Sequence, residues 1–366
     1  MRIALVTEFY YPHLGGVTEH VHNLALAFQR LGHEVIVVTA DMGDATHDGP
    51  FVRRIGTSRV IYSSGSFARV TTGWRLRARL RDLFRNERID IVHTHGPLAP
   101  TLGLAAPAAA HDLDLPVVGT FHSWFPHSAL YRVFRSTLQR RLDRYAATIA
   151  VSEPVVEAHG RYFRADWRVI PNGVDVELFR PDGAAERNGH GPRLLFLGRL
   201  DPRNGLDTLL RAMPGIVELA PRTRLIVAGD GPLRNVYERL ARPVAEHVEF
   251  IGYVNGDRPA RYAAADLYLC PTTKASFGIT LLEAMACGTP MLVSDITGFR
   301  ELVGGGSEAV MVPKADPAAW TRATVDLLPD HERRRAMGAA GRAKALRFAW
   351  PVVAEQVLDV YRSIGP

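Results

Sequence analysis

Short apolar runs alternate with helical stretches along the first half of the chain. Ile3 to Thr7, Glu34 to Thr39 and Ile89 to Thr94 are rich in Ile and Val, whereas Val17 to Leu31 repeats its apolar residues with a helical period. Continuous apolar strands that alternate with helices are typical of a parallel sheet covered on both faces. Two further runs extend the series, Pro116 to Thr120 and Ala147 to Val151. We therefore predict a doubly wound, Rossmann-like α/β domain over residues 1–180.

A second α/β series follows a polar, Gly-rich segment. Residues 181–192 have the composition of a linker, and the pattern after them predicts a second Rossmann-like domain over residues 193–345. Its expected strands are Arg193 to Leu197, Arg224 to Ala228, Val248 to Ile251, Leu267 to Cys270 and Pro290 to Ser294. Two such halves predict a ligand cleft between the carboxyl ends of two sets of strands. Residues 346–366 would close the chain with an amphipathic helix that carries Val357, Leu358 and Tyr361 on one stripe.

Length and composition agree with this division. The chain has 366 residues, more than one hydrophobic core usually supports, and 47% of them are hydrophobic. The apolar run from Ile3 to Val6 is too short for a signal peptide or a membrane span, so we predict a buried first strand. Cys270 and Cys287 lack the paired spacing of metal ligands, and we predict reduced thiols in the core.

The chain is basic, with a formal net charge of +6. A basic balance implies an acidic partner, which leaves nucleic acid, a phosphorylated ligand and an anionic membrane as the classes to separate. No nucleic-acid recognition motif is present in the sequence, so we expect no nucleic-acid partner.

A glycine pair, Gly15 and Gly16, stands between the first expected strand and the first expected helix. Glycines there allow backbone amides to approach an anion, and the start of the helix adds partial positive charge. The alternative is a tight turn that binds no ligand.

A second candidate site lies in the segment from Pro271 to Pro290. The pattern predicts a loop, then a helix opened by Ser276 and Gly278, and a terminal Gly followed by Pro. The amides at the start of this helix would face the cleft, and Glu283 would reach diol hydroxyls from the helix side. The alternative makes Glu283 a solvated helix residue, but its apolar neighbours argue against this.

These motifs, in this order, resemble a large family of retaining GT-B glycosyltransferases that includes the phosphatidylinositol mannosyltransferases and the PIG-A type N-acetylglucosaminyl transferases. The resemblance runs from end to end and rests also on Gly32 to Val35, Gly119 to His122, Val151-Ser152, Pro171 to Asp175, Gly198-Arg199 and Gly229 to Pro232. It implies two Rossmann-like domains facing a central cleft, with the C-terminal helix packed back toward the first domain. It also implies transfer of a hexose, with mannose favoured and GDP-mannose as donor, to a phosphatidylinositol-like or lipid-linked acceptor, with retention.

The resemblance also assigns roles to single residues. Arg199 would bind the donor diphosphate, Glu283 the donor ribose, and His122 would lie near the reacting sugar, so that His122 and Arg199 are the expected catalytic residues. The nucleotide-sugar is a co-substrate, and we expect no cofactor and no metal. The expected donor-binding residues are Gly15, Gly16, Arg199, Arg203, Asn204, Ser276, Phe277, Gly278, Ile279 and Glu283.

Two positions depart from the family pattern. Ala275 stands where the family has a first Glu that contacts sugar hydroxyls, and Asn204 stands where it has a Lys beside the diphosphate. Each change removes a charged contact of the kind worth about 1.5–3 kcal/mol. The departures are compatible with a decayed homologue, with another donor, or with compensation by Arg203 and Lys274. Because the other site residues remain, we expect an active enzyme in which Arg199 and the helix-start amides stabilise the leaving group.

A basic segment from Trp74 to Arg88 sets a stripe of apolar residues among arginines. Leu76, Leu80, Leu83 and Phe84 form the stripe, and the basic residues are Arg75, Arg77, Arg79, Arg81, Arg85 and Arg88. Such a helix either lies on an anionic membrane or turns its stripe to the core and its arginines to solvent.

The resemblance favours the membrane, because phosphatidylinositol mannosyltransferases use a basic segment here to meet membrane and head group. Arg69 matches an acceptor-phosphate residue of those enzymes, and Arg132, Arg135, Arg140, Arg141 and Arg144 would enlarge the basic face. We therefore expect Arg69, Arg75, Arg77, Arg79 and Arg81 to contact the acceptor or the membrane, in a cytoplasmic protein at the inner face of the plasma membrane. The alternatives are a nucleotide-sugar 2-epimerase of the same fold and a binding module without catalysis.

Overall fold

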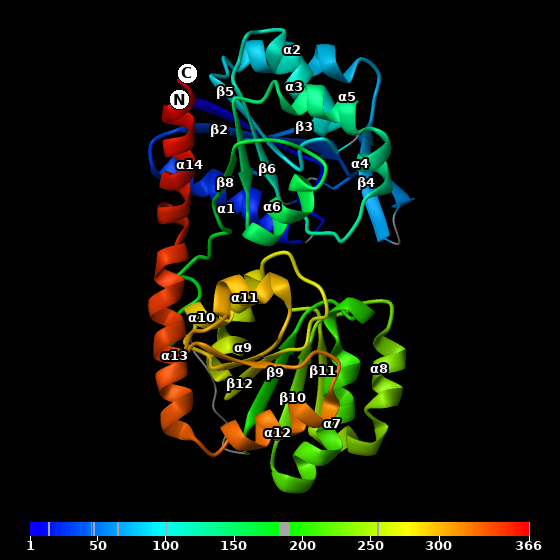
Figure 1. The fold of residues 1–366 in the computed structure, drawn as a ribbon, viewed down its shortest axis with the longest axis vertical. Helices are drawn as coiled ribbons and strands as arrows, with labels where there is room; N and C mark the ends of the chain where they lie inside the picture. The colour runs from blue at the N-terminus through cyan, green and yellow to red at the C-terminus, as the bar shows by residue number, and fades with distance from the viewer. Residues whose placement is uncertain are drawn as a thin grey trace. The chain divides into compact units, whose positions relative to one another are not determined.

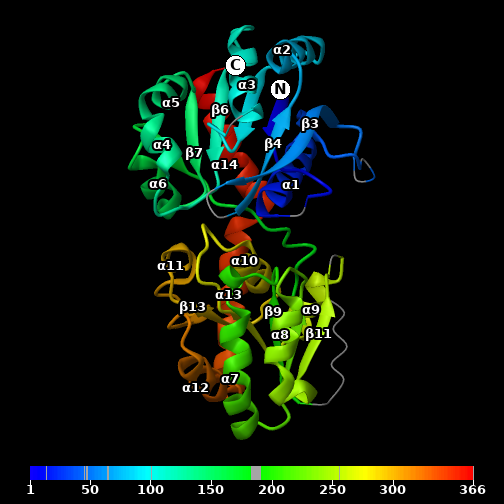
Figure 2. The same ribbon diagram turned by 90° about the vertical axis from the view of Figure 1, so that its right-hand side faces the viewer.

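The computed structural model describes residues 1–13, 15–44, 46, 48–63, 66–99, 101–182, 191–254 and 256–365, without the side chains of residues 60–69. Its contacts group into two compact units (Figures 1 and 2). The first unit combines Met1–Gly173 with Trp350–Pro366, and the second is Val174–Ala349. Each unit is an α/β body built on its own sheet.

The sheet of the first unit has the strand order β4-β3-β2-β1-β5-β6-β7-β8. Neighbouring strands pair in parallel except β3 and β4, which are antiparallel. The strands are β1 (Arg2–Thr7), β2 (Glu34–Asp41), β3 (Val52–Ser63), β4 (Ser66–Thr72), β5 (Ile91–His95), β6 (Val117–Phe121), β7 (Ala147–Ala150) and β8 (Trp167–Val169). The expected apolar runs are therefore strands, although β5 begins two residues later than predicted.

Both faces of this sheet are buried, as the continuous apolar runs predicted. Ile3 and Leu5 pack with α1 and α14 on one face, whereas Ala4 and Val6 pack with α2 and α3 on the other. Side chains of one strand alternate between faces, so a strand covered on both sides is apolar throughout. The helices of this unit are α1 (Gly16–Arg30), α2 (Leu76–Asn86), α3 (Leu102–His111), α4 (Ala129–Val133), α5 (Arg135–Leu142), α6 (Glu153–Gly160) and α14 (Trp350–Ile364).

The C-terminal helix α14 belongs to the N-terminal core. Val357, Leu358 and Tyr361 are buried in one cluster with residues of β1 and α1, and α14 runs beside α1 (Figure 1). The Tyr361 hydroxyl lies 2.6 Å from Nδ1 of His93 on β5. The prediction that the final helix packs back on the first domain is confirmed.

The second unit has a parallel sheet with the order β11-β10-β9-β12-β13-β14. Its strands are β9 (Arg193–Leu197), β10 (Arg224–Ala228), β11 (Val248–Gly252), β12 (Leu267–Cys270), β13 (Met291–Ser294) and β14 (Ala309–Val312). Its helices are η1 (Pro202–Asn204), α7 (Leu206–Leu219), α8 (Arg234–Leu240), η2 (Arg242–His247), α9 (Arg258–Ala264), α10 (Ile279–Ala286), α11 (Thr297–Val303), α12 (Pro317–Leu327), α13 (His331–Ala345) and η3 (Leu346–Phe348). Cys270 and Cys287 are free and buried, as predicted. Among the described residues of both units, no helix combines the length and the apolar character that a membrane crossing requires.

Candidate active site

In the first unit, three histidines meet at the carboxyl ends of neighbouring strands. His95 is the last residue of β5, His122 follows β6 directly, and His20 reaches them from α1. Nδ1 of His95 lies 3.1 Å from Nε2 of His122, and the His20 ring centroid lies 4.8 Å from that of His122. Sequence reasoning selected His122 but missed His20 and His95, although His95 also stands at a strand end.

Burial keeps these imidazoles neutral. Desolvation lowers the pKa of His20 to about 4, against a smaller opposing effect of its bond to Asn172. Desolvation, together with the neighbouring histidines, also holds the pKa of His95 and of His122 well below the usual range. Near neutral pH, His122 is therefore a neutral hydrogen-bonding group rather than a cation.

The segment Pro171 to Asp175 contacts this cluster directly through Asn172, and through Gly173 by way of Trp350. Oδ1 of Asn172 accepts a hydrogen bond from Nδ1 of His20 at 2.8 Å. A Cβ on Gly173 would stand 2.6 Å from the Trp350 ring, so only glycine fits under that side chain. Trp350 in turn packs edge-on against the His20 ring, with 5.3 Å between centroids.

Helix α1 begins at Gly16, with Gly15 as an extended N-cap that makes no side-chain cap. A Cβ at Gly15 would meet only Nε2 of His13, at 3.9 Å, so packing among the described residues does not require glycine there. The first amides of a helix lack intrahelical partners and favour an anion. The predicted anion site at Gly15 and Gly16 stays a prediction, and Leu14 beside it lies outside the described residues.

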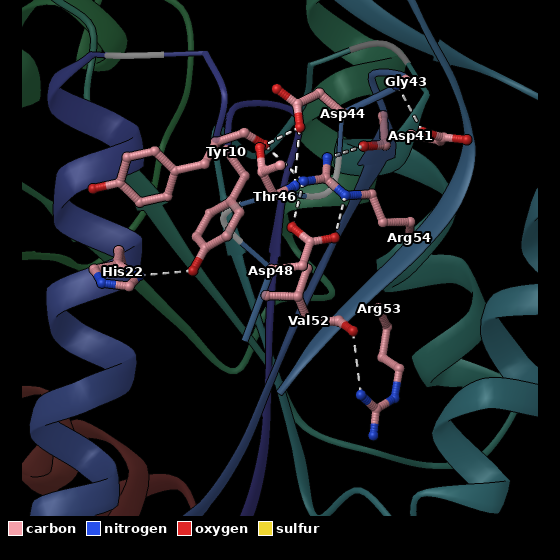
Figure 3. Close-up of polar contacts among 12 residues, drawn as sticks. Tyr10, His22, Asp41, Gly43, Asp44, Thr46, Asp48, Val52, Arg53 and Arg54 are labelled. Atoms are coloured by element: carbon pink, nitrogen blue, oxygen red, sulfur yellow. Dashed lines mark hydrogen bonds and ion pairs between the residues drawn. The ribbon is translucent and has the colours of Figure 1, made fainter. Parts of the chain in front are cut away.

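The chain before Gly15 and Gly16 is held by Arg54, which forms an ion pair with Asp48 (Figure 3). Arg54 of β3 donates to both carboxylate oxygens of Asp48, at 2.5 and 2.8 Å, and to the carbonyl of Tyr11 at 2.7 Å. The Tyr10 hydroxyl lies 2.9 Å from Nδ1 of His22 on α1 (Figure 3). These contacts fix the path of the chain from β1 into α1.

Glu8 is a buried acid at the end of β1 that sequence reasoning also missed. Its carboxylate accepts hydrogen bonds from the hydroxyls of Thr71 and Thr101 and from the amide of Leu102, the last at 2.7 Å. Burial raises its pKa, and these hydrogen bonds oppose that rise. The sequence feature that could have identified Glu8 is a carboxylate directly after a predicted buried strand. Its observed contacts join β1 to β4 and to the start of α3.

In the second unit, glycines let the loops after three strands pack closely. A Cβ on Gly229, after β10, would stand 2.0 Å from the Gly198 carbonyl oxygen after β9. A Cβ on Gly205 would stand 2.2 Å from the carbonyl oxygen of Pro271 after β12. The loop of Arg199 and Arg203 therefore lies against the loop that begins at Pro271, and the Thr273 amide donates to the Arg203 carbonyl at 2.8 Å.

Arg199 is exposed at this strand edge. Its side chain retains 64% of its accessible surface, and its Nε lies 4.0 Å from Oδ2 of Asp201. Asn204 has a different position, because its side-chain amide donates to the Arg199 carbonyl at 2.7 Å. Asn204 therefore stabilises the turn that carries Arg199, and its predicted donor contact is untested.

The structure corrects the predicted opening of α10. Gly278, with φ of 104°, is the N-cap and the helix begins at Ile279, so Ser276 lies two residues before the cap. Phe277 is buried beside Phe348, whereas Ser276 and Ile279 are half-buried. A Cβ on Gly298 would stand 2.0 Å from the Ala275 carbonyl oxygen, so Gly298 allows the loop to pass close to α11.

Glu283 is 4% exposed and is not a solvated helix residue. Its Oε1 accepts from Nη1 of Arg258 at 2.8 Å, and its Oε2 accepts from the Tyr262 hydroxyl at 3.0 Å. Burial and the Glu283 charge hold the pKa of Tyr262 well above its usual value. Sequence reasoning missed Arg258. The available signal was its spacing of four residues from Tyr262, which places both on one face of α9.

The apolar stripe of α2 faces the domain core. Leu80 and Phe84 are completely buried, and Leu76 and Leu83 pack against the same cluster. The prediction that this stripe meets a membrane is therefore wrong, because α2 needs it to cover the sheet. Contact through the arginines stays a prediction.

Several basic residues of the first unit lie on or beside α2 and α5. Arg75, Arg77 and Arg79 are exposed, and Arg81 pairs with Asp82 at 3.1 Å. Arg77, which pairs with Asp112, lines a cavity of about 460 Å³ together with residues of α3 and α5. The other basic residues of that cavity are His111, Arg140, Arg141 and Arg144. The two predicted basic stretches thus meet at one cavity. Arg69 lies in β4, but its side chain is outside the described part.

Comparisons with known proteins cover both units. The family model Glycosyltransferase Family 4 matches residues 14–178, and the model Glycosyl transferases group 1 matches residues 191–330. The chain is 33% identical over 371 residues to the phosphatidyl-myo-inositol mannosyltransferase of Mycobacterium leprae, which covers 100% of this chain and 97% of that protein.

It is also 30% identical over 381 residues to the GDP-mannose-dependent alpha-(1-6)-phosphatidylinositol monomannoside mannosyltransferase of Mycobacterium tuberculosis, with coverage of 99% and 98%. Among solved structures, it is similar to a glycosyltransferase from Rickettsia africae. The TM-score is 0.80 at 16% identity, over 99% of this chain and 98% of that one.

Proposed function

The chain belongs to the glycosyltransferase family of the phosphatidyl-myo-inositol mannosyltransferases, and on this premise we propose that it transfers mannose from GDP-mannose to a phosphatidylinositol-like lipid. It has the GT-B fold that the sequence predicted. The proposed substrates rest on one observation, the full-length similarity to mannosyltransferases. The names of these relatives include phosphatidyl-myo-inositol in one case, and GDP-mannose with phosphatidylinositol monomannoside in the other. The donor, the acceptor and retention of configuration are parts of the proposal.

The second unit would bind the nucleoside diphosphate. Arg199 presents an exposed guanidinium on a loop that Gly205, Gly229 and Asn204 hold in place. A guanidinium and the amides at the start of α10 stabilise the charge that develops on a leaving diphosphate, which is electrostatic catalysis that uses no metal. A ribose hydroxyl would share the Glu283 carboxylate with Arg258 and Tyr262.

The first unit would bind the acceptor. Its exposed arginines suit an anionic lipid surface, since each basic side chain near such a surface contributes to binding. His122 is neutral and half-buried at a strand end, so it suits a hydrogen bond to a sugar hydroxyl better than an ion pair to phosphate. We place the protein peripherally on the inner face of the plasma membrane.

Ala275 and Asn204 are compatible with an active enzyme. The Asn204 amide and the backbone of Ala275 both belong to ordered, closely packed loops of the second unit. A decaying site would lose such contacts, whereas adaptation to altered donor contacts would keep them. We therefore favour adaptation over loss of catalysis.

Product analysis with labelled nucleotide sugars and anionic lipids tests the proposal. The expected product is a mannosylated lipid that forms with GDP-mannose and phosphatidylinositol vesicles. The variant Arg199→Ala should reduce product formation, and Arg211→Ala, an exposed arginine of α7, is its matched control. A free epimer of the sugar nucleotide would instead indicate the 2-epimerase, and binding without turnover would indicate the non-catalytic module.

A further inference from the structure

The histidine cluster of the first unit has a geometry that its sugar-binding role does not explain. His20, His95 and His122 come from α1, from β5 and from the residue after β6, and one ring nitrogen of each lies within 4.8 Å of the others. His95 and His122 are already in contact, with 3.1 Å between Nδ1 and Nε2. Three imidazoles from three elements thus point their nitrogens at one small volume.

The contact of His20 with Asn172 determines which nitrogen of His20 is available to a ligand. Oδ1 of Asn172 can only accept, so Nδ1 of His20 carries the proton of their 2.8 Å bond. The Nε2 atom of His20 therefore holds a lone pair. A ligand histidine in a metal site commonly donates its other N–H to a carbonyl or carboxylate oxygen, which orients the ring and fixes the tautomer.

Hydrogen bonding alone leaves the cluster incomplete. His95 is 2% exposed, and its Nε2 has no hydrogen-bond partner among the described residues. Whichever tautomer His95 adopts in its contact with His122, one buried nitrogen stays unpaired. Unpaired buried polar atoms are rare in native structures. This nitrogen is not the one that faces His122, so the case for an ion rests on the convergence of the three rings.

We propose that His20, His95 and His122 form a binding site for a divalent transition metal ion of the Zn²⁺ type. Imidazole nitrogen suits Zn²⁺, Co²⁺ and Ni²⁺, whereas Mg²⁺ and Ca²⁺ take oxygen ligands that this cluster does not offer. Ligands about 2.0–2.1 Å from a tetrahedral Zn²⁺ stand roughly 3.3 Å apart, close to the observed 3.1 Å between His95 and His122. The wider spacing in the cluster, up to 4.8 Å, has to close by a side-chain shift when the ion binds. Three protein ligands leave a fourth position for water or a hydroxyl.

The site has a consequence that rests on the proposed function. An ion held by His122 would withdraw that imidazole from the sugar, so it would inhibit transfer rather than assist it. Added Zn²⁺ should therefore lower mannosyl transfer, and a chelator should restore it.

Metal titration of the full chain tests the site without any assay of activity. We expect one Zn²⁺ per chain by calorimetry, and visible absorption from Co²⁺ that Zn²⁺ displaces. His20→Gln, His95→Gln and His122→Gln should each abolish this signal, and Asn172→Ala should weaken Zn²⁺ binding about 10- to 100-fold. His127→Gln, an exposed histidine of the same unit, is the matched control and should bind as the parent does.

Because His20 and His95 are buried, thermal unfolding must show that these variants remain folded, and half-buried His122 provides the safer substitution. Absence of stoichiometric binding in the parent, or equal Zn²⁺ affinity in parent and His122→Gln, would overturn the site. Zn²⁺ binding with full transferase activity would overturn only the inhibitory role. Zn²⁺ binding in a protein that transfers no mannose would support the site and overturn the proposed function.

Discussion

The two units have the same kind of sheet but opposite chemistry at their strand ends. In the first unit, the ends of β5 and β6 carry neutral histidines, His95 buried and His122 half-buried. In the second unit, the loop after β9 carries an exposed cation, and the buried acid Glu283 is neutralised by Arg258. One fold therefore supports either a desolvated polar cluster or a charged anion site, depending on which side chains follow the strands. Five predictions test this contrast.

The largest effect should come from the buried ion pair of the second unit. Glu283→Ala leaves Arg258 and the buried Tyr262 hydroxyl without their acceptor. Removal of one partner of a buried pair costs about 3–5 kcal/mol, and because the Arg258 side chain is 21% exposed we expect the lower end. We expect a loss of that size in the free energy of unfolding, measured with denaturant, together with weaker donor binding. The control is Glu218→Ala, an exposed acid of α7 that should change stability by less than about 0.5 kcal/mol. Equal stability of Glu283→Ala and parent would contradict the pairing.

The second-largest effect should be that a fall in pH destabilises the first unit before the second. Desolvation by burial lowers the pKa of His20 and of His159 to about 4, below the ordinary histidine value of 6.5. Between these values the unfolded chain binds protons that the folded chain does not, so stability is full above pH 6.5 and falls toward pH 4. These two groups together contribute about 3 kcal/mol per pH unit at most, and the other histidines of this unit with lowered pKa, His93, His95 and His122, add to the effect. Amide hydrogen exchange at pH 6.5 and 5 should show earlier loss of protection in the first unit. Earlier loss in the second unit would refute this.

Arg199→Ala should weaken binding of the donor and of free GDP about 10- to 100-fold, because it removes one charged contact to the diphosphate. Its high exposure means that stability should hardly change. Titration calorimetry with both ligands measures the effect, with Arg211→Ala as control. Binding like that of the parent protein would show that the donor site is placed wrongly.

Reversing the charge of Arg77, Arg79 and Arg81 should reduce binding to phosphatidylinositol-containing vesicles roughly tenfold or more. Because the leucine stripe of α2 is buried, the attraction should be electrostatic and should vanish in high salt. The control reverses three exposed arginines of the second unit, Arg211, Arg222 and Arg335. Salt-insensitive sedimentation, or an equal loss in the control, would argue against this surface.

The smallest effect should follow Ala275→Glu. The backbone of Ala275 is packed against Gly298, so a new carboxylate would enter a loop that has already adjusted to its absence. We expect no gain in turnover with GDP-mannose. A large gain would show a damaged site rather than an adapted one.

The local pattern of apolar and polar residues predicted most of the strands and the final helix. Apolar runs identified the strands because a strand buried on both faces must be apolar throughout, as Ile3 to Val6 shows. The spacing of Val357, Leu358 and Tyr361 identified the final helix, because one turn of a helix spans fewer than four residues and its apolar stripe can be seen in a short stretch of sequence. At Gly205 and Gly229, glycine allows loops that follow strands to approach each other closely, which the sequence pattern did not predict.

Only the tertiary structure determined which side chains contact one another. The sequence does not reveal that Glu283 pairs with Arg258, that the α2 stripe faces the sheet, or that His20, His95, His122 and Asn172 meet. These contacts depend on which strands are neighbours and on how each helix crosses the sheet. Burial and partner charge also determine the protonation of each group, so the neutral histidines of one unit and the charged pair of the other follow from packing rather than from residue type.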